Sequence, residues 1–292
     1  MNYAIHILIT VNIFVLLALA LDLLVGYAGL MSLAHGAFFG IGAYSTALLT
    51  KAGWPALAAQ SAGMLLAALL SGLIAIPSMR VRGIYLLIIT IAVQIMFSVA
   101  AQNWIGLTGG DAGLANIPPY SIFGYALRGV YFLVVCTACS VFWFLLCRRL
   151  TTSPFGRLLR ALRDDEVGCA ALGKNVVAAK MAVFAFSAAL AAFSGSLFAH
   201  YTAYVDPRSF EIGVSILVLL MVMLGGAGTL TGPILGAIVL SVLPEAFKFL
   251  PLPPGAAAAS RQLLFGLMLV LVVYFRPQGL IGRRRSQIAT HG

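Results

Sequence analysis

The sequence predicts an all-α membrane protein, built as a polytopic transmembrane helical bundle. Of its 292 residues, 62% are hydrophobic and 9% are charged, whereas soluble domains contain about 45–50% apolar residues. Several apolar runs reach the roughly 20 residues that a helix needs to cross a hydrocarbon core of about 30 Å. The alternation of apolar and polar residues that barrel strands require is not visible. We therefore expect a single transmembrane domain over residues 1–292.

The apolar runs predict about 8 to 10 spans. Glycine residues and Pro233 interrupt the longest run, as in a broken or re-entrant helix, and splitting it there gives about nine apolar segments. The exact number stays open. The runs cover residues 5–25, 28–50, 55–78, 84–101, 125–147, 176–204, 212–249 and 260–281.

Basic residues predict how the spans are oriented. Lys and Arg gather in cytoplasmic loops, so we expect the loop 148–177 in the cytoplasm, the loop 102–120 outside, the N-terminus outside and the C-terminus in the cytoplasm of a bacterial inner (plasma) membrane. The net charge of +10 follows from the same bias and does not require nucleic acid. If the spans alternate, the basic residues of the cytoplasmic side are Arg80, Arg82, Arg148, Arg149, Arg157, Arg160, Arg163, Lys174, Lys180, Arg276 and Arg283 to Arg285.

The stretch SPFGRLLRALRDDEVGCAALGKNV, residues 153–176, is a charged island in this apolar chain. Ser153 and Pro154 suit the start of one helix. Asp164 is expected to cap a second helix of about two to three turns, and Gly173 is expected to end it. The stretch therefore predicts a pair of short cytoplasmic helices.

The second helix of this pair carries a small apolar face. Val167, Ala170 and Ala171 share that face, and Asp165 and Glu166 lie at the positive end of the helix dipole. Such a face suits a groove on another protein. The charge pattern fits a docking element and a solvated connector equally well.

Ionisable residues inside the spans are few, although each one is costly there. Asp22 lies near the end of the first run and suits the interface slightly better than a role in the path. His35 lies among Gly36, Gly40 and Gly42, which allow another helix to approach closely, and it suits either packing or a translocation path. A path that must release its substrate is expected to be lined by small or weakly polar groups. The candidates are Ser32, His35, Tyr44, Gln94 and Thr108.

The sequence lacks the motifs of hydrolytic or phosphate-binding enzymes, G-x-S-x-G, H-E-x-x-H and G-x-x-x-x-G-K-[ST] among them. Of its four cysteines, Cys136 and Cys139 share a helix face, but no histidine or further thiol lies nearby in the sequence to complete a metal site. We therefore expect no catalytic residue, no metal and no cofactor. Two distant segments, GYAGLMS at 26–32 and GGAGTLT at 225–231, share the pattern G-x-A-G-x-x-[ST]. This pattern fits an internal repeat, and it also fits small residues that simply interrupt two helices.

The chain resembles the permease subunits of branched-chain amino-acid ABC importers, of the LivM type. The resemblance covers nearly the whole chain, in the order that the family has. The stretches that carry it are GYAGLMSLAHGAFFGIGAYSTALL, VRGIYLLIITIAVQ, NWIGLTGGDAGL, SPFGRLLRALRDDEVGCAALGKNV, LVLLMVMLGGAGTLTGPILGA and RPQGLIGRR.

The resemblance implies a subunit that forms half of a translocation path and performs no chemistry of its own. It implies as partners a second, LivH-like permease, two cytoplasmic ATP-binding subunits and an external substrate-binding protein. It also implies that the charged island docks into an ATPase through a pattern like E-A-A followed by glycine. The implied coupling residues are Asp164, Asp165, Glu166, Val167, Ala170, Ala171 and Gly173, although Val167 and Gly168 stand where that pattern has alanines.

Other functions remain open at this point. Related permeases carry urea or short amides, so the substrate class is not fixed. An autonomous ion-coupled carrier or channel is a further alternative, although the spans offer few of the acidic residues that a relay needs. A membrane enzyme is a third alternative, and the missing motifs make it weaker.

Overall fold

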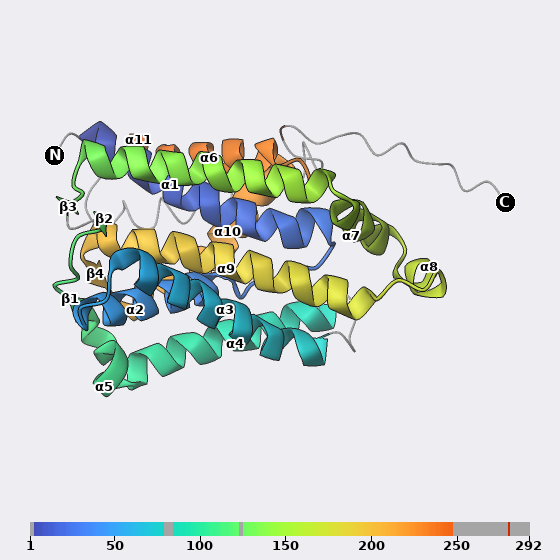
Figure 1. The fold of residues 1–292 in the computed structure, drawn as a ribbon, viewed down its shortest axis with the longest axis horizontal. Coiled ribbons are helices and arrows are strands. Elements are labelled where there is room, and N and C mark those ends of the chain that lie inside the picture. Colours follow the sequence, from blue (N-terminus) through green and yellow to red (C-terminus); the bar gives the residue numbers. More distant parts are fainter. Residues whose placement is uncertain (1–2, 79–83, 123–124, 248–279, 281–292) are drawn as a thin grey trace.

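The computed structural model describes residues 3–78, 84–122, 125–247 and 280. It is a bundle of long helices that lie side by side (Figure 1), which confirms the all-α class. In chain order the helices are α1 (Tyr3–Asp22), α2 (His35–Lys51), α3 (Ala56–Ser78), α4 (Ile84–Asn103), α5 (Ile105–Thr108), α6 (Val130–Thr152), α7 (Pro154–Asp164), α8 (Glu166–Ala171), α9 (Val176–Thr202), α10 (Ile212–Gly225) and α11 (Thr231–Phe247).

Short elements join these helices. A π-helical turn, η1 (Leu23–Tyr27), continues α1, and two 3-10 turns are η2 (Gly110–Ala112) and η3 (Pro207–Phe210). The strands β1 (Leu114–Ala115) and β4 (Tyr204–Val205) form one antiparallel pair, and β2 (Ser121–Ile122) and β3 (Tyr125–Ala126) form another. The sequence did not predict these strands, since a two-residue pairing leaves no alternating pattern to recognise.

Five helical segments of the described part are long and apolar enough to cross a membrane, namely Tyr3–Tyr27, Tyr85–Asn103, Val130–Thr152, Val176–Thr202 and Pro207–Gly225. Two shorter apolar helices are Ala56–Gly72 and Thr231–Leu243. These helices make the chain a multi-pass membrane protein. The total of about 8 to 10 spans stays a prediction.

Two predicted spans begin later in the structure, and one of them, the run 125–147, becomes helical only at Val130, after β3. The run 28–50 becomes helical only at His35, because Gly29, at a φ of +69°, takes a left-handed backbone that ends the first helix. The run 212–249 divides into α10 and α11 around its glycines, as predicted. The last run, 260–281, lies outside the described residues except for Leu280.

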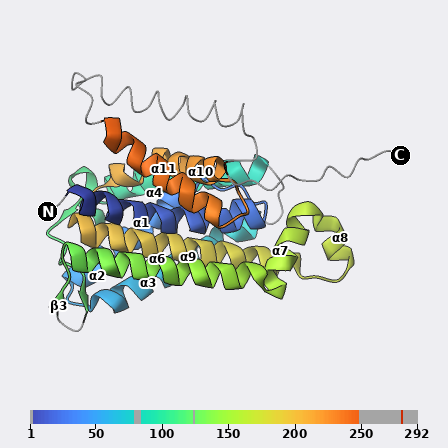
Figure 2. The same ribbon diagram turned by 90° about the horizontal axis from the view of Figure 1, so that it is seen from above.

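The bundle is built around α1. Its second half is apolar on all sides and buried, as expected for a central helix. It packs against α6, α9, α10 and α11, while α2 packs against α3 and α9 (Figure 2). Apolar side chains on the outer faces of α3, α4 and α6, among them Leu69, Met96 and Phe142, remain exposed, as suits a surface toward lipid or another membrane subunit.

Small residues bring α2 and α9 together. A Cβ atom on Gly42 would overlap the backbone carbonyl of Ala192, and a Cβ atom on Gly195 would overlap the carbonyl of Phe39. Both glycines are therefore required by the close approach of the two backbones. The small residues around His35 were predicted to serve this purpose, and the contact at Gly42 confirms it.

The two ends of the bundle differ. The helices α7 and α8 project beyond one end, and α5 and the strand pairs lie at the other (Figures 1 and 2). We call these the helical end and the strand end. The helical end holds the charged island, and the strand end holds the loop 102–120. At the strand end Tyr120 donates a hydrogen bond to Oε1 of Gln60 over 2.9 Å, and burial raises the pKa of its hydroxyl.

Candidate functional site

The charged island begins as the sequence predicts. The hydroxyl of Ser153 accepts a hydrogen bond from the backbone N–H of Gly156 over 3.3 Å, and Pro154 is the first residue of α7. Leu159 and Leu162 face the bundle and are buried. Residues 148–152, which we expected in the loop, instead form the end of α6, so the loop itself starts at Ser153.

The second helix is capped one residue later than predicted. Asp164 is the last residue of α7, and Asp165 caps α8, its Oδ1 accepting from the N–H of Gly168 over 2.9 Å. Asp165 has the extended backbone, φ −150° and ψ 99°, that an N-cap residue requires. At the other end Gly173, at a φ of +74°, donates to the carbonyl of Ala170. The helix has six residues, fewer than expected.

The predicted apolar face lies at the tip of the projecting part. Val167 is 59% exposed, and Ala170 and Ala171 are also exposed. Leu172, which the sequence analysis did not select, is 79% exposed and extends this surface. We call these four residues the tip patch. A signal for Leu172 was present in its position between the alanine pair and the helix-ending Gly173.

Internal contacts hold α8 in place beneath the tip patch. Glu166, one of the expected coupling residues, pairs with Lys180 of α9, with 2.7 Å between Oε1 and Nζ. The side chain of Lys180 is nearly buried, so a charge partner is required there. Asn175 caps α9 by accepting from the N–H of Ala178 over 3.0 Å. The ion pair joins α8 to α9, and the cap fixes where α9 begins.

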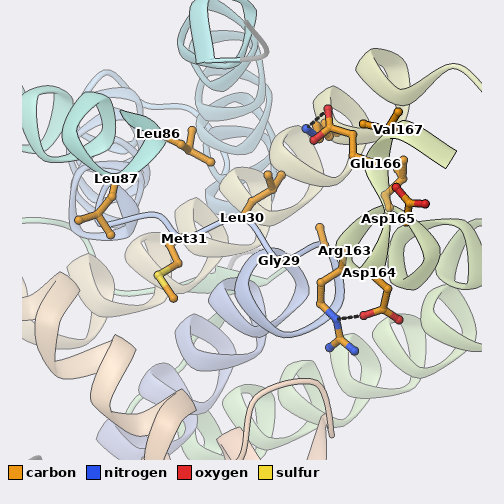
Figure 3. Close-up of a pocket in the computed structure, with 13 residues that line it drawn as sticks. Gly29, Leu30, Met31, Leu86, Leu87, Arg163, Asp164, Asp165, Glu166 and Val167 are labelled. Atoms are coloured by element: carbon orange, nitrogen blue, oxygen red, sulfur yellow. Dashed lines mark hydrogen bonds and ion pairs between the residues drawn. The ribbon is translucent and has the colours of Figure 1, made fainter. Parts of the chain in front are cut away.

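A cavity of about 590 Å³ separates α8 from the body of the bundle. Figure 3 shows the α7 and α8 side of the cavity, with Asp164, Asp165 and Glu166 next to Arg163 and Val167, and apolar side chains on the opposite side. The apolar side consists of Leu30 and Met31, from the segment that follows η1, and Leu86 and Leu87 of α4. The charged island therefore borders this cavity while Glu166 joins it to α9.

Asp22 lies deeper than expected. It was predicted to reach the interface, but its side chain is fully buried. Its Oδ1 accepts from the backbone N–H of Gly228, over 2.7 Å. The buried carboxylate thus joins the end of α1 to the loop between α10 and α11. The segments 26–32 and 225–231, which share a sequence pattern, meet at this point.

Three of the candidate path residues surround the start of α2. His35 Nε2 lies 2.9 Å from the hydroxyl of Ser187. Gln94 Oε1 accepts from the N–H of Ala37 over 2.7 Å, and the hydroxyl of Ser32 accepts from the N–H of Ala34 over 3.3 Å. Ser32, His35 and Gln94 are buried. Ser32 and Gln94 satisfy backbone N–H groups at a helix start that would otherwise lack partners inside the bundle.

The other two candidates lie apart from this cluster. Tyr44 is buried beside Phe97 and Phe210. Thr108 is at the strand end, where its hydroxyl donates to the carbonyl of Ala101 over 2.6 Å. The structure therefore brings three of the five candidates together and separates two.

The described residues contain no group of three or more His, Cys, Asp or Glu side chains placed to hold a metal ion. The four cysteines are free thiols. Cys136, Cys139 and Cys147 lie along α6, and Cys169 lies in α8.

The chain matches a family model described as the branched-chain amino acid transport system permease component, over residues 3–273. It is 33% identical to the permease protein LivM of the high-affinity branched-chain amino acid transport system of Escherichia coli K12, over 94% of this chain and 69% of that protein. It is 26% identical to the LivH permease of the same strain, over 92% and 91% of the two chains.

A third relative is the permease protein BraD of Pseudomonas aeruginosa, which is 29% identical over 92% of each chain. No solved structure gives a significant match. The family match spans nearly all of the helices described above, from α1 through α11. The chain therefore belongs to the family of permease components of branched-chain amino acid transport systems.

Proposed function

We propose that this chain forms half of the translocation path of an ATP-driven importer for branched-chain amino acids. In this proposal the chain works with a second related permease, two cytoplasmic ATP-binding subunits and an external substrate-binding protein. It performs no chemistry, and ATP hydrolysis belongs to its partners. The similarity to both LivM and LivH supports the pairing of two related permeases.

The tip patch carries the coupling part of the proposal. The tip patch is an exposed apolar surface at the end of a charged projection. A simple connector does not explain it, because exposure of Val167 and Leu172 to water is unfavourable. Burial of these side chains in a partner's groove would be favourable and would explain their exposure in the isolated chain. The proposed coupling residues are Asp164, Asp165, Glu166, Val167, Ala170, Ala171 and Gly173, joined by Leu172. Within this set Asp165 and Glu166 shape α8, and the tip patch makes the contact.

The charge distribution supports an orientation with the helical end in the cytoplasm of the inner membrane. The N-terminus is then outside and the C-terminus inside. Among the described residues, the exposed basic residues of the strand end are Lys51, Arg128 and Arg208, whereas those of the helical end include Arg148, Arg149, Arg157, Arg160, Arg163 and Lys174. The excess at the helical end follows the positive-inside rule.

We expect impermeant thiol labelling of intact cells to show this orientation. In a background without the native cysteines, Asp111→Cys should react from outside, because Asp111 is exposed at the strand end. Arg160→Cys, exposed on α7, should react only after the membrane is permeabilised. Reaction of Arg160→Cys but not of Asp111→Cys in intact cells would reverse the topology.

We further propose that the path passes beside the polar cluster at the start of α2. The support is that Ser32, His35 and Gln94 gather where α2 begins inside the bundle, and that irregular backbone in a span is typical of transport paths. Tyr44 and Thr108 complete the candidate set toward the strand end. Uptake that is unchanged by bulky replacements at all five positions would contradict this part of the proposal.

Whole-cell uptake tests the proposed function. The chain, expressed with its candidate partners in cells that lack their own branched-chain transporters, should import labelled leucine. Excess isoleucine or valine should compete, and urea and acetamide should not. Uptake of urea without uptake of leucine would instead favour the related amide permeases. Leucine uptake that needs no ATP-binding subunit would favour an autonomous carrier.

A further inference from the structure

One side chain of the charged island reaches into the helix bundle. Arg163, next to the end of α7, donates from Nη1 to the backbone carbonyl of Gly26 over 2.5 Å. Its Nε lies 3.4 Å from Oδ1 of Asp164, and its side chain is 31% exposed. Arg163 thus links α7 to the π-helical turn η1 at the end of α1, 137 positions earlier in the sequence.

The carbonyl of Gly26 is at a crossing of two broken helices. A Cβ atom on Gly26 would overlap both the backbone N of Gly228 and Oδ1 of Asp22. A Cβ atom on Gly228 would lie 2.9 Å from the Gly26 oxygen and 3.4 Å from Nη1 of Arg163. The break after α1 and the break between α10 and α11 therefore touch through backbone atoms, with no room for a methyl group between them.

An acidic and a basic side chain lie on the two sides of this crossing. The Asp22 carboxylate holds the N–H of Gly228 from inside the bundle, and the Arg163 guanidinium holds the carbonyl of Gly26 from the α7 side. The second carboxylate oxygen, Oδ2, is buried and has no hydrogen-bond partner among the described residues. We call Asp22, Gly26, Arg163 and Gly228 the glycine clamp.

We propose that Arg163 is the positioning residue that passes movement of the charged island to the two helix breaks. This inference rests on the proposed function, in which an ATPase moves α8. A displacement of α8 can reach Arg163 because α7, which ends at Asp164, is joined to α8 through Asp165 alone. Glycines with a left-handed backbone, such as Gly29 and Gly228, can change their φ and ψ angles with little strain. At the glycine clamp, a displaced charged island would therefore act on backbone whose φ and ψ angles can change.

The chemistry of the clamp calls for arginine. The guanidinium presents several donors in a planar fork, so it can hold the Gly26 carbonyl through Nη1 while Nε faces Asp164. A lysine ammonium has no such fork and reaches fewer acceptors at fixed geometry. We therefore expect Arg163→Lys to be intermediate between the wild type and Arg163→Gln.

The test uses the complete complex in proteoliposomes and measures leucine uptake per ATP hydrolysed. Arg163→Gln should assemble with its partners and hydrolyse ATP, while uptake per ATP falls about ten-fold, within the range of coupling energies between linked sites. The matched control is Arg160→Gln, one turn earlier on α7. Arg160 is exposed and its charge acts on Tyr27, but the Gly26 carbonyl is held by Arg163, so the Arg160 variant should keep the wild-type ratio.

Three results would overturn the inference. The first is a wild-type ratio of uptake to hydrolysis in Arg163→Gln. The second is an equal loss in Arg160→Gln. The third is failure of Arg163→Gln to bind the ATP-binding subunits, since Arg163 would then be a docking residue. These results differ from failure of the proposed function, which would show itself as absent ATP-driven leucine uptake in the wild-type complex.

Discussion

Ala171→Arg is expected to abolish association with the ATP-binding subunits while leaving the permease folded. Ala171 is exposed in the tip patch, so the isolated permease should change in stability by no more than about 0.5 kcal/mol. In a partner's groove the same change buries bulk and an unpaired charge, at a cost of about 2–4 kcal/mol. Co-purification and ATP turnover of the reconstituted complex measure the effect.

Ala161→Arg is the matched control for this experiment. Ala161 is exposed on α7, outside the tip patch, so the same added charge should leave assembly intact. Equal loss of assembly in both variants would assign the effect to added charge in the loop. Wild-type assembly of Ala171→Arg, with substrate-stimulated turnover, would show that the charged island is a solvated connector.

Gly195→Leu is expected to prevent the bundle from packing. The new side chain would overlap the carbonyl of Phe39 in α2, so α2 and α9 must separate. Overpacking of this kind costs about 3 kcal/mol or more when the obstacle is backbone. Thermal unfolding in detergent should show a large loss of stability, or the folded protein should not accumulate at all.

Gly72→Leu is the control for this second effect. Gly72 also lies within a helix, α3, but a Cβ atom there meets nothing within 4 Å. The replacement should be tolerated, since leucine favours the helix more than glycine does. Similar destabilisation by both variants would mean that helix composition, and not the contact between α2 and α9, decides the outcome.

Local signals predicted the features that depend on neighbouring residues. The start of α7 followed from Ser153 and Pro154, because an N-cap hydrogen bond joins residues three positions apart. The cap of α8 was misplaced by one residue, since Asp164 and Asp165 have the same capping chemistry and differ only in backbone conformation. The start of α2 was placed too early because hydropathy does not distinguish an apolar irregular segment from a helix.

Contacts between residues far apart in the chain could not be predicted from the sequence. Glu166 was selected as a coupling residue, but its partner Lys180 lies in another helix, and nothing in the spacing indicates that pair. The glycine clamp joins positions 22, 26, 163 and 228 through the three-dimensional path of the chain. The shared pattern of residues 26–32 and 225–231 was visible, whereas the contact between the two segments was not.

ATP-driven uptake by the reconstituted complex tests the central claim most directly. Proteoliposomes would hold this chain and its partner permease, with and without the two ATP-binding subunits, and the binding protein and labelled leucine would be supplied on the outer side. We expect leucine accumulation only when the ATP-binding subunits and internal ATP are both present. Equal leucine accumulation without these subunits would contradict the account.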